Sequence, residues 1–244
     1  MEFAGKVVLI SGAGRPGGQG AAEALWLVQQ GAQVIIGDIS DDEGQALATD
    51  IGANCHYTHL DVTDAGDWQK AMSLAESLGG LHGLVNNAAI YIPAHIHDAD
   101  PEHFLLHLKV NTFGPFLGIK TALPLMERSG KASIVNIASS AGMKGSPRAV
   151  AYSSSKWGLR GLTRSIAADL GPKGIRVNSI YPGPIETRMI MGWDEATRAA
   201  RTAQVPLRRN GKIEEVAELV GFLLSERSGF ITGSEIAIDG GVTL

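Results

Sequence analysis

The stretch Val7-Val8-Leu9-Ile10-Ser11-Gly12-Ala13-Gly14-Arg15-Pro16-Gly17-Gly18-Gln19-Gly20 decides the fold of this chain. Its apolar run predicts a buried strand, and the five glycines in residues 11–20 predict a tight turn that opens a helix. A turn between a strand and a helix N-terminus leaves backbone N–H groups free and adds the positive end of the helix dipole. We therefore predict a phosphate site of the dinucleotide-binding type, with a merely flexible connection as the alternative.

The same order of strand and helix continues along the rest of the chain. Short runs rich in Val and Ile are apolar at nearly every position, which is typical of parallel strands covered on both faces. The seven strand candidates are 7–10, 33–36, 57–60, 83–85, 133–137, 175–180 and 235–238. The clearest helix candidates are 21–30, 68–78, 104–126, 152–170 and 213–224. This alternation predicts an α/β fold, a doubly wound parallel sheet with helices on both faces, in a single domain over residues 1–244. Residues 182–210 interrupt the rhythm and are a candidate substrate lid.

Composition and charge exclude several classes of function. The 244 residues are 44% hydrophobic and 19% charged, so the chain is not disordered. The net charge is −4 and no basic run is longer than Arg208-Arg209, so the sequence shows no positively charged stretch that would indicate binding to nucleic acid or to a membrane surface. Cys55 is the only cysteine, which favours a reducing compartment, and no signal peptide is evident, so we expect a cytoplasmic protein. The seven histidines, all between His56 and His107, show no metal-ligand pattern, and we expect no metal.

Asp38 ends the second predicted strand, 18 residues after Gly20. An acid at about this spacing, roughly 20 residues, binds the adenosine ribose hydroxyls in dinucleotide-binding folds. Its carboxylate would repel a 2′-phosphate, so NAD is favoured over NADP as cofactor. A helix-capping aspartate is the alternative, and Arg15 is a minor argument for NADP.

Motifs along essentially the whole chain resemble the short-chain dehydrogenase/reductase family, in its shorter single-domain branch with a Rossmann-like fold. The motifs that carry the resemblance are Ser11-Gly12 with Gly18 and Gly20, Asp61-Val62, Asn86-Asn87-Ala88-Ala89, Asn111, Ser139, Tyr152 with Lys156, Tyr181-Pro182-Gly183-Pro184-Ile185-Glu186-Thr187, and Ile238-Asp239-Gly240-Gly241. Two departures stand out: the glycine turn is two residues longer than usual and contains Pro16, and Ala89 replaces a glycine.

Tyr152 and Lys156 carry the predicted chemistry together with Ser139. Their i, i+4 spacing places the tyrosine and the lysine on one face of a helix. A tyrosine has an ordinary pKa of about 10, and a nearby ammonium group lowers it, so Lys156 is expected to activate Tyr152 as general acid and base. Ser139 is expected to share the substrate oxygen with Tyr152, with the adjacent Ser140 as the competing choice.

The resemblance implies further roles. Lys156 would also hold the nicotinamide ribose, and Asn111 would support it through water, unless Asn111 is simply a satisfied buried amide. The resemblance places Asn87 near the cofactor ribose and Asp61-Val62 near the adenine, with a turn or cap role as the alternative for the polar pair. It directs Ile185 and Thr187 toward the carboxamide. Apolar residues near Ser139 and in the lid are candidate pocket lining, with core packing or a subunit interface as the alternative: Met143, Met189, Met191 and Trp193.

The sequence therefore predicts an NAD-dependent dehydrogenase that interconverts a secondary alcohol and a ketone, with a moderately apolar substrate that is steroid-like, cyclic or aromatic. The first alternative is an NADPH-dependent 3-oxoacyl-thioester reductase, against which Asp38 argues. A non-catalytic dinucleotide sensor is the second, although it would be expected to lack Ser139, Tyr152 or Lys156, which are all present. The resemblance implies a homotetramer or homodimer.

Overall fold

One seven-stranded parallel sheet forms the centre of the protein, in the order β3-β2-β1-β4-β5-β6-β7. The computed structural model describes residues 1–186, 194 and 202–244. The strands are β1 (Val7–Ser11), β2 (Gln33–Asp38), β3 (Cys55–His59), β4 (Gly83–Asn86), β5 (Ala132–Ile137), β6 (Ile175–Pro182) and β7 (Glu235–Ile238). All seven predicted strands are confirmed, as is the α/β class.

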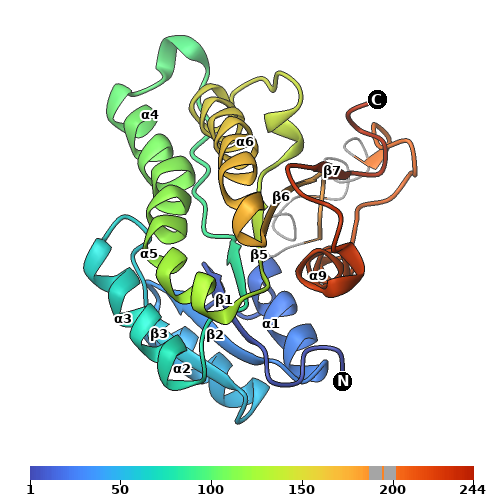
Figure 1. The fold of residues 1–244 in the computed structure, drawn as a ribbon. Helices are drawn as coiled ribbons and strands as arrows, with labels where there is room; N and C mark the ends of the chain where they lie inside the picture. Colours follow the sequence, from blue (N-terminus) through green and yellow to red (C-terminus); the bar gives the residue numbers. More distant parts are fainter. Residues whose placement is uncertain (187–193, 195–201) are drawn as a thin grey trace.

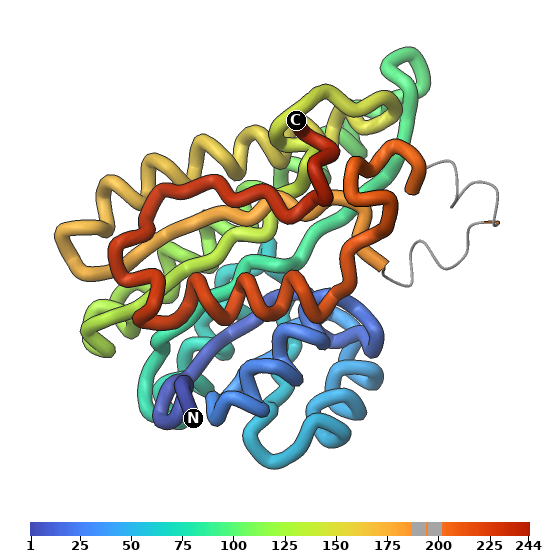
Figure 2. Tube along the Cα trace, turned by 90° about the vertical axis from the view of Figure 1, so that its right-hand side faces the viewer, coloured from blue at the N-terminus to red at the C-terminus, as the bar shows by residue number. Residues whose placement is uncertain are grey.

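The helices cover the sheet in two layers. They are α1 (Gln19–Gln29), α2 (Asp41–Ile51), α3 (Ala65–Ser77), α4 (Pro101–Leu108), α5 (Gly114–Ser129), α6 (Val150–Leu170) and α9 (Ile213–Leu224). Figure 1 shows α3, α5 and α6 on one side of the sheet and α1 and α9 on the other, and Figure 2 shows α1 and α9 lying side by side. Two apolar clusters fill the spaces between sheet and helices, one under each layer.

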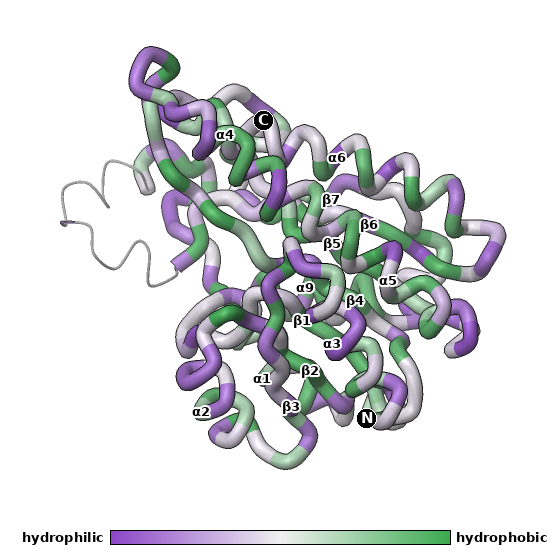
Figure 3. Tube along the Cα trace, turned by 90° about the vertical axis from the view of Figure 1, so that its left-hand side faces the viewer, coloured by the Kyte–Doolittle hydropathy of each residue, from purple (hydrophilic) through white to green (hydrophobic). Residues whose placement is uncertain are grey.

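Strand burial explains why the prediction of the sheet succeeded. The strands β1, β4 and β5 are buried along their whole length, so their sequences are apolar without alternation. Figure 3 shows these central strands as mainly hydrophobic, whereas helix α6 alternates between hydrophilic and hydrophobic segments. No helix in the described residues is long and apolar enough to cross a membrane.

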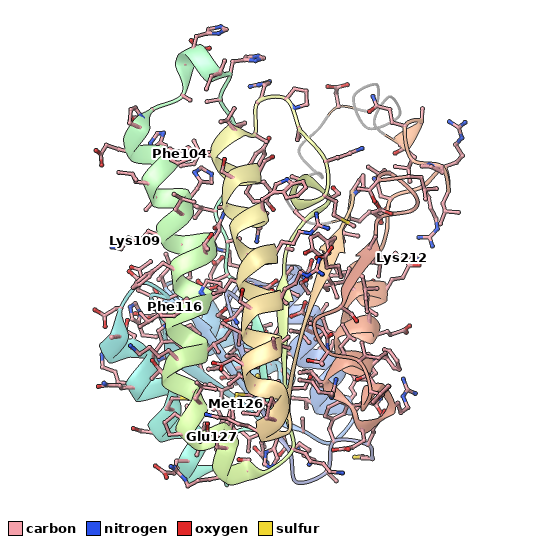
Figure 4. All side chains as sticks on the ribbon, turned by 45° about the horizontal axis from the view of Figure 1, so that its top comes forward. Phe104, Lys109, Phe116, Met126, Glu127 and Lys212 are labelled. Carbon is pink, nitrogen blue, oxygen red and sulfur yellow. The ribbon has the colours of Figure 1, made fainter. Side chains whose placement is uncertain are left out.

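The helix layer differs from the prediction at two places. Helix α2 was not among the sequence candidates, because its first turn is acidic and it buries little more than Leu47 and Ala48. The predicted helix 104–126 is longer and not uniform: it begins at Pro101, contains a π-helical turn, η2 (Lys109–Phe113), and ends at Ser129. Figure 4 shows the two parts as one continuous column beside α6.

Candidate active site

The predicted site residues lie along the edge of the sheet where the parallel strands end. The strand order reverses between β1 and β4, which pair with Ser11 opposite Asn86. In open α/β sheets the crevice at such a reversal, outside the carboxyl ends of the strands, is where ligands bind. The loops after β1, β2, β4 and β5 all begin at this edge.

Close neighbours leave no room for a side chain at two glycines of the first turn. Gly12 has φ +66°, and a Cβ there would lie 2.5 Å from the Cα of Ala88. A Cβ on Gly20 would lie 2.8 Å from the side-chain nitrogen of Asn87. The turn is thus pressed against the loop after β4, and a side chain at either position would push the two loops apart.

The start of α1 remains open despite the longer turn. The two additional residues are absorbed in a turn in which Gly18 N–H donates to the carbonyl of Arg15 at 3.1 Å, with Gly17 at φ +71° and Pro16 before it. Gly18 is the N-cap residue, no side chain caps the helix, and its first turn holds no acidic residue. Free amides at a helix N-terminus are what a pyrophosphate needs, so this glycine cradle fits a dinucleotide.

Asp38 faces this turn from the end of β2. One carboxylate oxygen accepts from Gly14 N–H at 3.0 Å and the other from Ser40 N–H at 3.1 Å. Only 8% of the residue is exposed, and a Cβ on Gly14 would lie 2.6 Å from its Cβ. Ser40, not Asp38, holds the N-cap position of α2. The carboxylate is therefore fixed beside the glycine turn, where a ribose bound to that turn would meet it.

Asp61 and Val62 follow β3, and their contacts are local. A carboxylate oxygen of Asp61 accepts from Thr63 N–H at 2.8 Å, and the carbonyl of Val62 accepts from the indole of Trp68 at 2.9 Å. The side chain of Val62 packs against Gly114. These hydrogen bonds shape the loop after β3, and the family resemblance implies that the adenine lies near this loop.

Asn87 links the loop after β4 to the glycine turn. Its amide nitrogen donates to the carbonyls of Ser11 at 3.1 Å and Gly12 at 2.8 Å. The hydroxyl of Ser11 in turn accepts from the backbone N–H groups of Asn87 and Ala88, both at 3.2 Å. The two loops therefore form one unit on which a cofactor could rest.

The predicted catalytic residues come together around the first turn of α6. Tyr152 lies in that turn and Lys156 one turn later, with its Nζ 5.6 Å from the centre of the Tyr152 ring. Ser139 follows β5, where its hydroxyl accepts from Ala141 N–H at 3.2 Å and interacts with the Tyr152 hydroxyl. Lys156 is buried and donates to the carbonyl of Ile137 at 2.8 Å. A serine hydroxyl, a phenol and a lysine thus meet at one place.

Burial sets the ionisation of this group. Desolvation raises the pKa of Tyr152 above its ordinary value, and the hydrogen bond with Ser139 counters this only in part. Burial lowers the pKa of Lys156 to about 7. Desolvation is thus the main influence on the pKa of Tyr152 in this arrangement, and activation of the tyrosine by Lys156 stays a prediction.

Asn111 occupies the π-helical turn η2 and is fully buried. Its side-chain oxygen accepts from Ile90 N–H at 2.9 Å, and its nitrogen donates to the Ile90 carbonyl and to the Ser155 hydroxyl, each at 3.0 Å. The side chain thereby ties the loop after β4 to α6 beside Lys156. Single π-helical turns inside longer helices are frequent at functional sites.

Two aromatic neighbours of Tyr152 were not identified from the sequence. The Tyr91 ring contacts it edge-on at 5.0 Å between ring centres, and the His107 ring lies 6.4 Å away. His107 Nε2 accepts from Ile92 N–H at 3.1 Å, so Nδ1 carries the proton toward the His103 carbonyl. Tyr91 lies in the loop after β4, and that position at the edge where the strands end was the available signal; His107 lies on α4 and had no such signal.

The predicted lid is described only in part. Ile185 is buried and bridges to Gly211, whose N–H donates to the Pro184 carbonyl at 2.9 Å. Thr187, Met189, Met191 and Trp193 lie outside the described residues. Met143, the fourth pocket candidate, packs against a small apolar cluster that contains Tyr181.

Comparisons with known proteins found a matching family model and several similar dehydrogenases. A family model described as enoyl-(acyl carrier protein) reductase matches residues 12–243. A trans-4-hydroxycyclohexanecarboxylate dehydrogenase of Sinomonas cyclohexanicum is 43% identical, over 99% of this chain and 94% of that protein. A 3-alpha-(or 20-beta)-hydroxysteroid dehydrogenase of Mycobacterium tuberculosis is 42% identical, over 97% and 89%. A cyclopentanol dehydrogenase of Comamonas testosteroni is 37% identical, over 98% and 97%.

Proposed function

The chain belongs to the short-chain dehydrogenase/reductase family, and from that premise we propose that it is an NAD-dependent dehydrogenase of cyclic secondary alcohols. Dehydrogenases of this family use NAD or NADP. The observation that carries the proposal is the meeting of Ser139, Tyr152 and Lys156 beside a glycine turn that Asp38 faces. The names of the similar dehydrogenases support a ring-shaped substrate.

Each residue of the group has a role in this proposal. Ser139 and Tyr152 donate hydrogen bonds to the substrate oxygen, which stabilises the alkoxide that develops during ketone reduction. In alcohol oxidation the Tyr152 phenolate removes the hydroxyl proton while the carbinol carbon loses its hydrogen as a hydride. Lys156 holds the ribose next to the reacting carbon, with Asn111 fixing the helix turn beside it. The nicotinamide, when bound, supplies or accepts the hydride.

The other cofactor contacts follow from the crevice. Gly12, Gly18 and Gly20 allow the pyrophosphate to approach the α1 N-terminus, and Asn87 braces that turn. Asp38 binds the adenosine ribose. The proposal also keeps Asp61 and Val62 near the adenine and Ile185 and Thr187 near the carboxamide, by resemblance. Tyr91 and His107 border the substrate oxygen because both rings adjoin Tyr152.

A panel of alcohols and ketones tests the assignment. With NAD, rings such as cyclohexanols, cyclopentanol and hydroxysteroids are expected to produce NADH absorbance at higher kcat/KM than short linear alcohols. A 3-oxoacyl-thioester reductase is the second candidate, because of the description of the matching family model. Turnover of 3-oxoacyl thioesters with NADPH, together with no oxidation of cyclic alcohols, would establish that alternative and contradict the proposal.

The pH dependence of the two directions is expected to be opposite. Because burial raises the pKa of Tyr152, the phenolate forms only at alkaline pH. Alcohol oxidation needs the phenolate, so its kcat/KM should rise through the alkaline range, whereas ketone reduction needs the phenol and should fall. Initial rates in both directions, from about pH 6 to about pH 10, check this. An oxidation rate at saturating NAD that falls on the alkaline side while the protein stays folded would contradict the role of Tyr152.

A second copy of the chain is the proposed partner. Large apolar side chains are exposed along α4, η2, α5 and α6: Leu105, Leu106, Phe113, Phe116 and Trp157. Figure 4 shows α5 and α6 next to each other on this side, with Phe116 labelled on α5. A dimer or tetramer would cover them. Light scattering should give at least twice 25.6 kDa, and Phe116→Arg should lower the mass. A wild-type protein found only at 25.6 kDa would contradict this expectation.

A further inference from the structure

A buried carboxyl group that has no ion pair in the described part of the chain lies in α1, the helix that follows the glycine turn. Glu23, on α1, is fully buried. Its Oε1 accepts from the side-chain nitrogen of Gln19 at 2.9 Å, and its Oε2 has no hydrogen-bond partner in the described part of the chain. Burying a carboxyl oxygen without a hydrogen-bond partner costs free energy of folding, so we expect Glu23 to have a function that offsets this cost.

Glu23 ends a chain of hydrogen bonds that reaches the glycine turn. The Gln19 nitrogen that binds Glu23 also donates to the side-chain oxygen of Asn87 at 3.3 Å. Asn87 in turn donates to the carbonyls of Ser11 and Gly12. Since carbonyls only accept, the Asn87 nitrogen must face the turn and its oxygen must face Gln19. Gln19 therefore presents its amide nitrogen, and Glu23 accepts the second hydrogen.

The elements packed against α1 offer Glu23 no cation. These are β1, β2, α2 and α9, and neither they nor α1 contain a lysine or an arginine. Their ionisable groups are all acids: Asp38 on β2; Asp41, Asp42, Glu43 and Asp50 on α2; and Glu214, Glu215 and Glu218 on α9. Several of these have partners elsewhere, Asp41 with His59, Glu43 with Arg15 and Glu215 with Arg209. Figure 2 shows α9 lying along α1 on this face.

We propose that Glu23 is a positioning residue for the dinucleotide, acting through Gln19 and Asn87 on the carbonyls of the Gly12 turn. The inference rests on the proposed function, because the ligand of that turn is the NAD of the dehydrogenase. It differs from the direct contacts proposed for the glycines, since Glu23 is fully buried behind the helix N-terminus and acts only through Gln19.

The positioning depends on the proton of the carboxyl group. Burial raises the pKa of Glu23 to about 8, so near neutral pH the group is mostly neutral. Above that pH, an uncompensated negative charge forms in α1 behind the amides that hold the pyrophosphate. Two negative groups in a region of low dielectric repel each other, so binding of NADH should weaken as the pH rises.

The test measures the dissociation constant of NADH by fluorescence from about pH 7 to about pH 9.5 for wild type, Glu23→Gln and Glu218→Gln. Glu23→Gln keeps an acceptor for Gln19 and removes the titration, and Glu218→Gln is the matched control because Glu218 is exposed on α9. At about pH 9.5 the wild-type Kd should exceed that of Glu23→Gln by about fivefold or more, with Glu218→Gln following wild type. Lys156 titrates in the same range in all three proteins, so the difference between variants is the measured quantity.

A second variant tests the chain of bonds without changing Glu23. Gln19→Met removes the donor in the middle and should raise the Kd of NADH by about fivefold at pH 7. Parallel pH profiles for wild type and Glu23→Gln, or an unchanged Kd in folded Gln19→Met, would overturn the role of Glu23 and leave the proposed function intact. Failure of wild type to bind NADH at any pH would overturn both.

Discussion

Replacing Tyr152 by phenylalanine is expected to lower kcat by about 10³-fold, the size of a lost general acid and base. The substitution removes one hydroxyl, which interacts with Ser139, and leaves the ring in contact with Tyr91 and near Lys156. Since the ring and its packing stay, the dissociation constant of NADH should change by less than about twofold. Initial rates and NADH fluorescence on the same preparation measure the two quantities.

Tyr91→Phe is the matched control for this prediction. It removes a hydroxyl from the neighbouring ring, whose contact with Tyr152 is made edge-on. We expect its kcat to stay within about fivefold of wild type, because that hydroxyl has no part in the proton transfer. Comparable activity in Tyr152→Phe and wild type would disprove the mechanism, and equal losses in the two variants would show that the Tyr152 hydroxyl has no special role in proton transfer.

Exchanging Asp38 for asparagine is expected to shift cofactor selectivity toward NADP by about 50-fold, measured as the ratio of kcat/KM values with NAD and NADP. The carboxylate would accept hydrogen bonds from ribose hydroxyls and repel a 2′-phosphate, and the amide loses the charge that does both. Asparagine retains an oxygen that can accept from Gly14 N–H, so the turn keeps its shape.

Two companions isolate the effect of the charge at Asp38. Asp38→Ala also removes the acceptor for Gly14 and Ser40, so it should weaken binding of both cofactors in addition to changing the preference. Asp42→Asn removes an exposed charge on α2 near the same edge and should leave the ratio unchanged within about twofold. An unaltered ratio in Asp38→Asn would refute the ribose role, and the same shift in Asp42→Asn would indicate a general effect of net charge.

Strand prediction from the sequence was accurate because the sheet is covered on both faces. The run 7–10 has no exposed face, so it is apolar at every position. The run 175–180 is also almost entirely buried, and it is apolar at every position except Arg176, Asn178 and Ser179. Helix α2 lacked such a signal because most of its residues face water and only a short stripe is buried. The π-helical turn at Asn111 could not be predicted either, because residues 109–113 lie inside a longer helical pattern and the turn is set by what the helix packs against.

Part of the candidate site could likewise be predicted from the sequence, and part could not. The residues at strand ends and the Tyr152-Lys156 pair could be placed from the sequence, because parallel strands end at one edge and an i, i+4 pair shares one helix face. The pKa values could not be predicted, since burial depends on every surrounding element, and it is desolvation that raises the pKa of Tyr152.

By itself, the sequence determined the order of the strands and most of the helices and the crevice at the strand ends, because these follow from local periodicity and spacing, and the family resemblance indicated which residues to expect there. Only the tertiary structure decided which side chains from distant segments share a dry environment. It brought Tyr91 and His107 to Tyr152, closed the longer glycine turn on itself at Gly18, and left Glu23 buried with no cation beside it among the described residues. Desolvation and hydrogen-bond direction are properties of the packed interior, and no single stretch of sequence contains them.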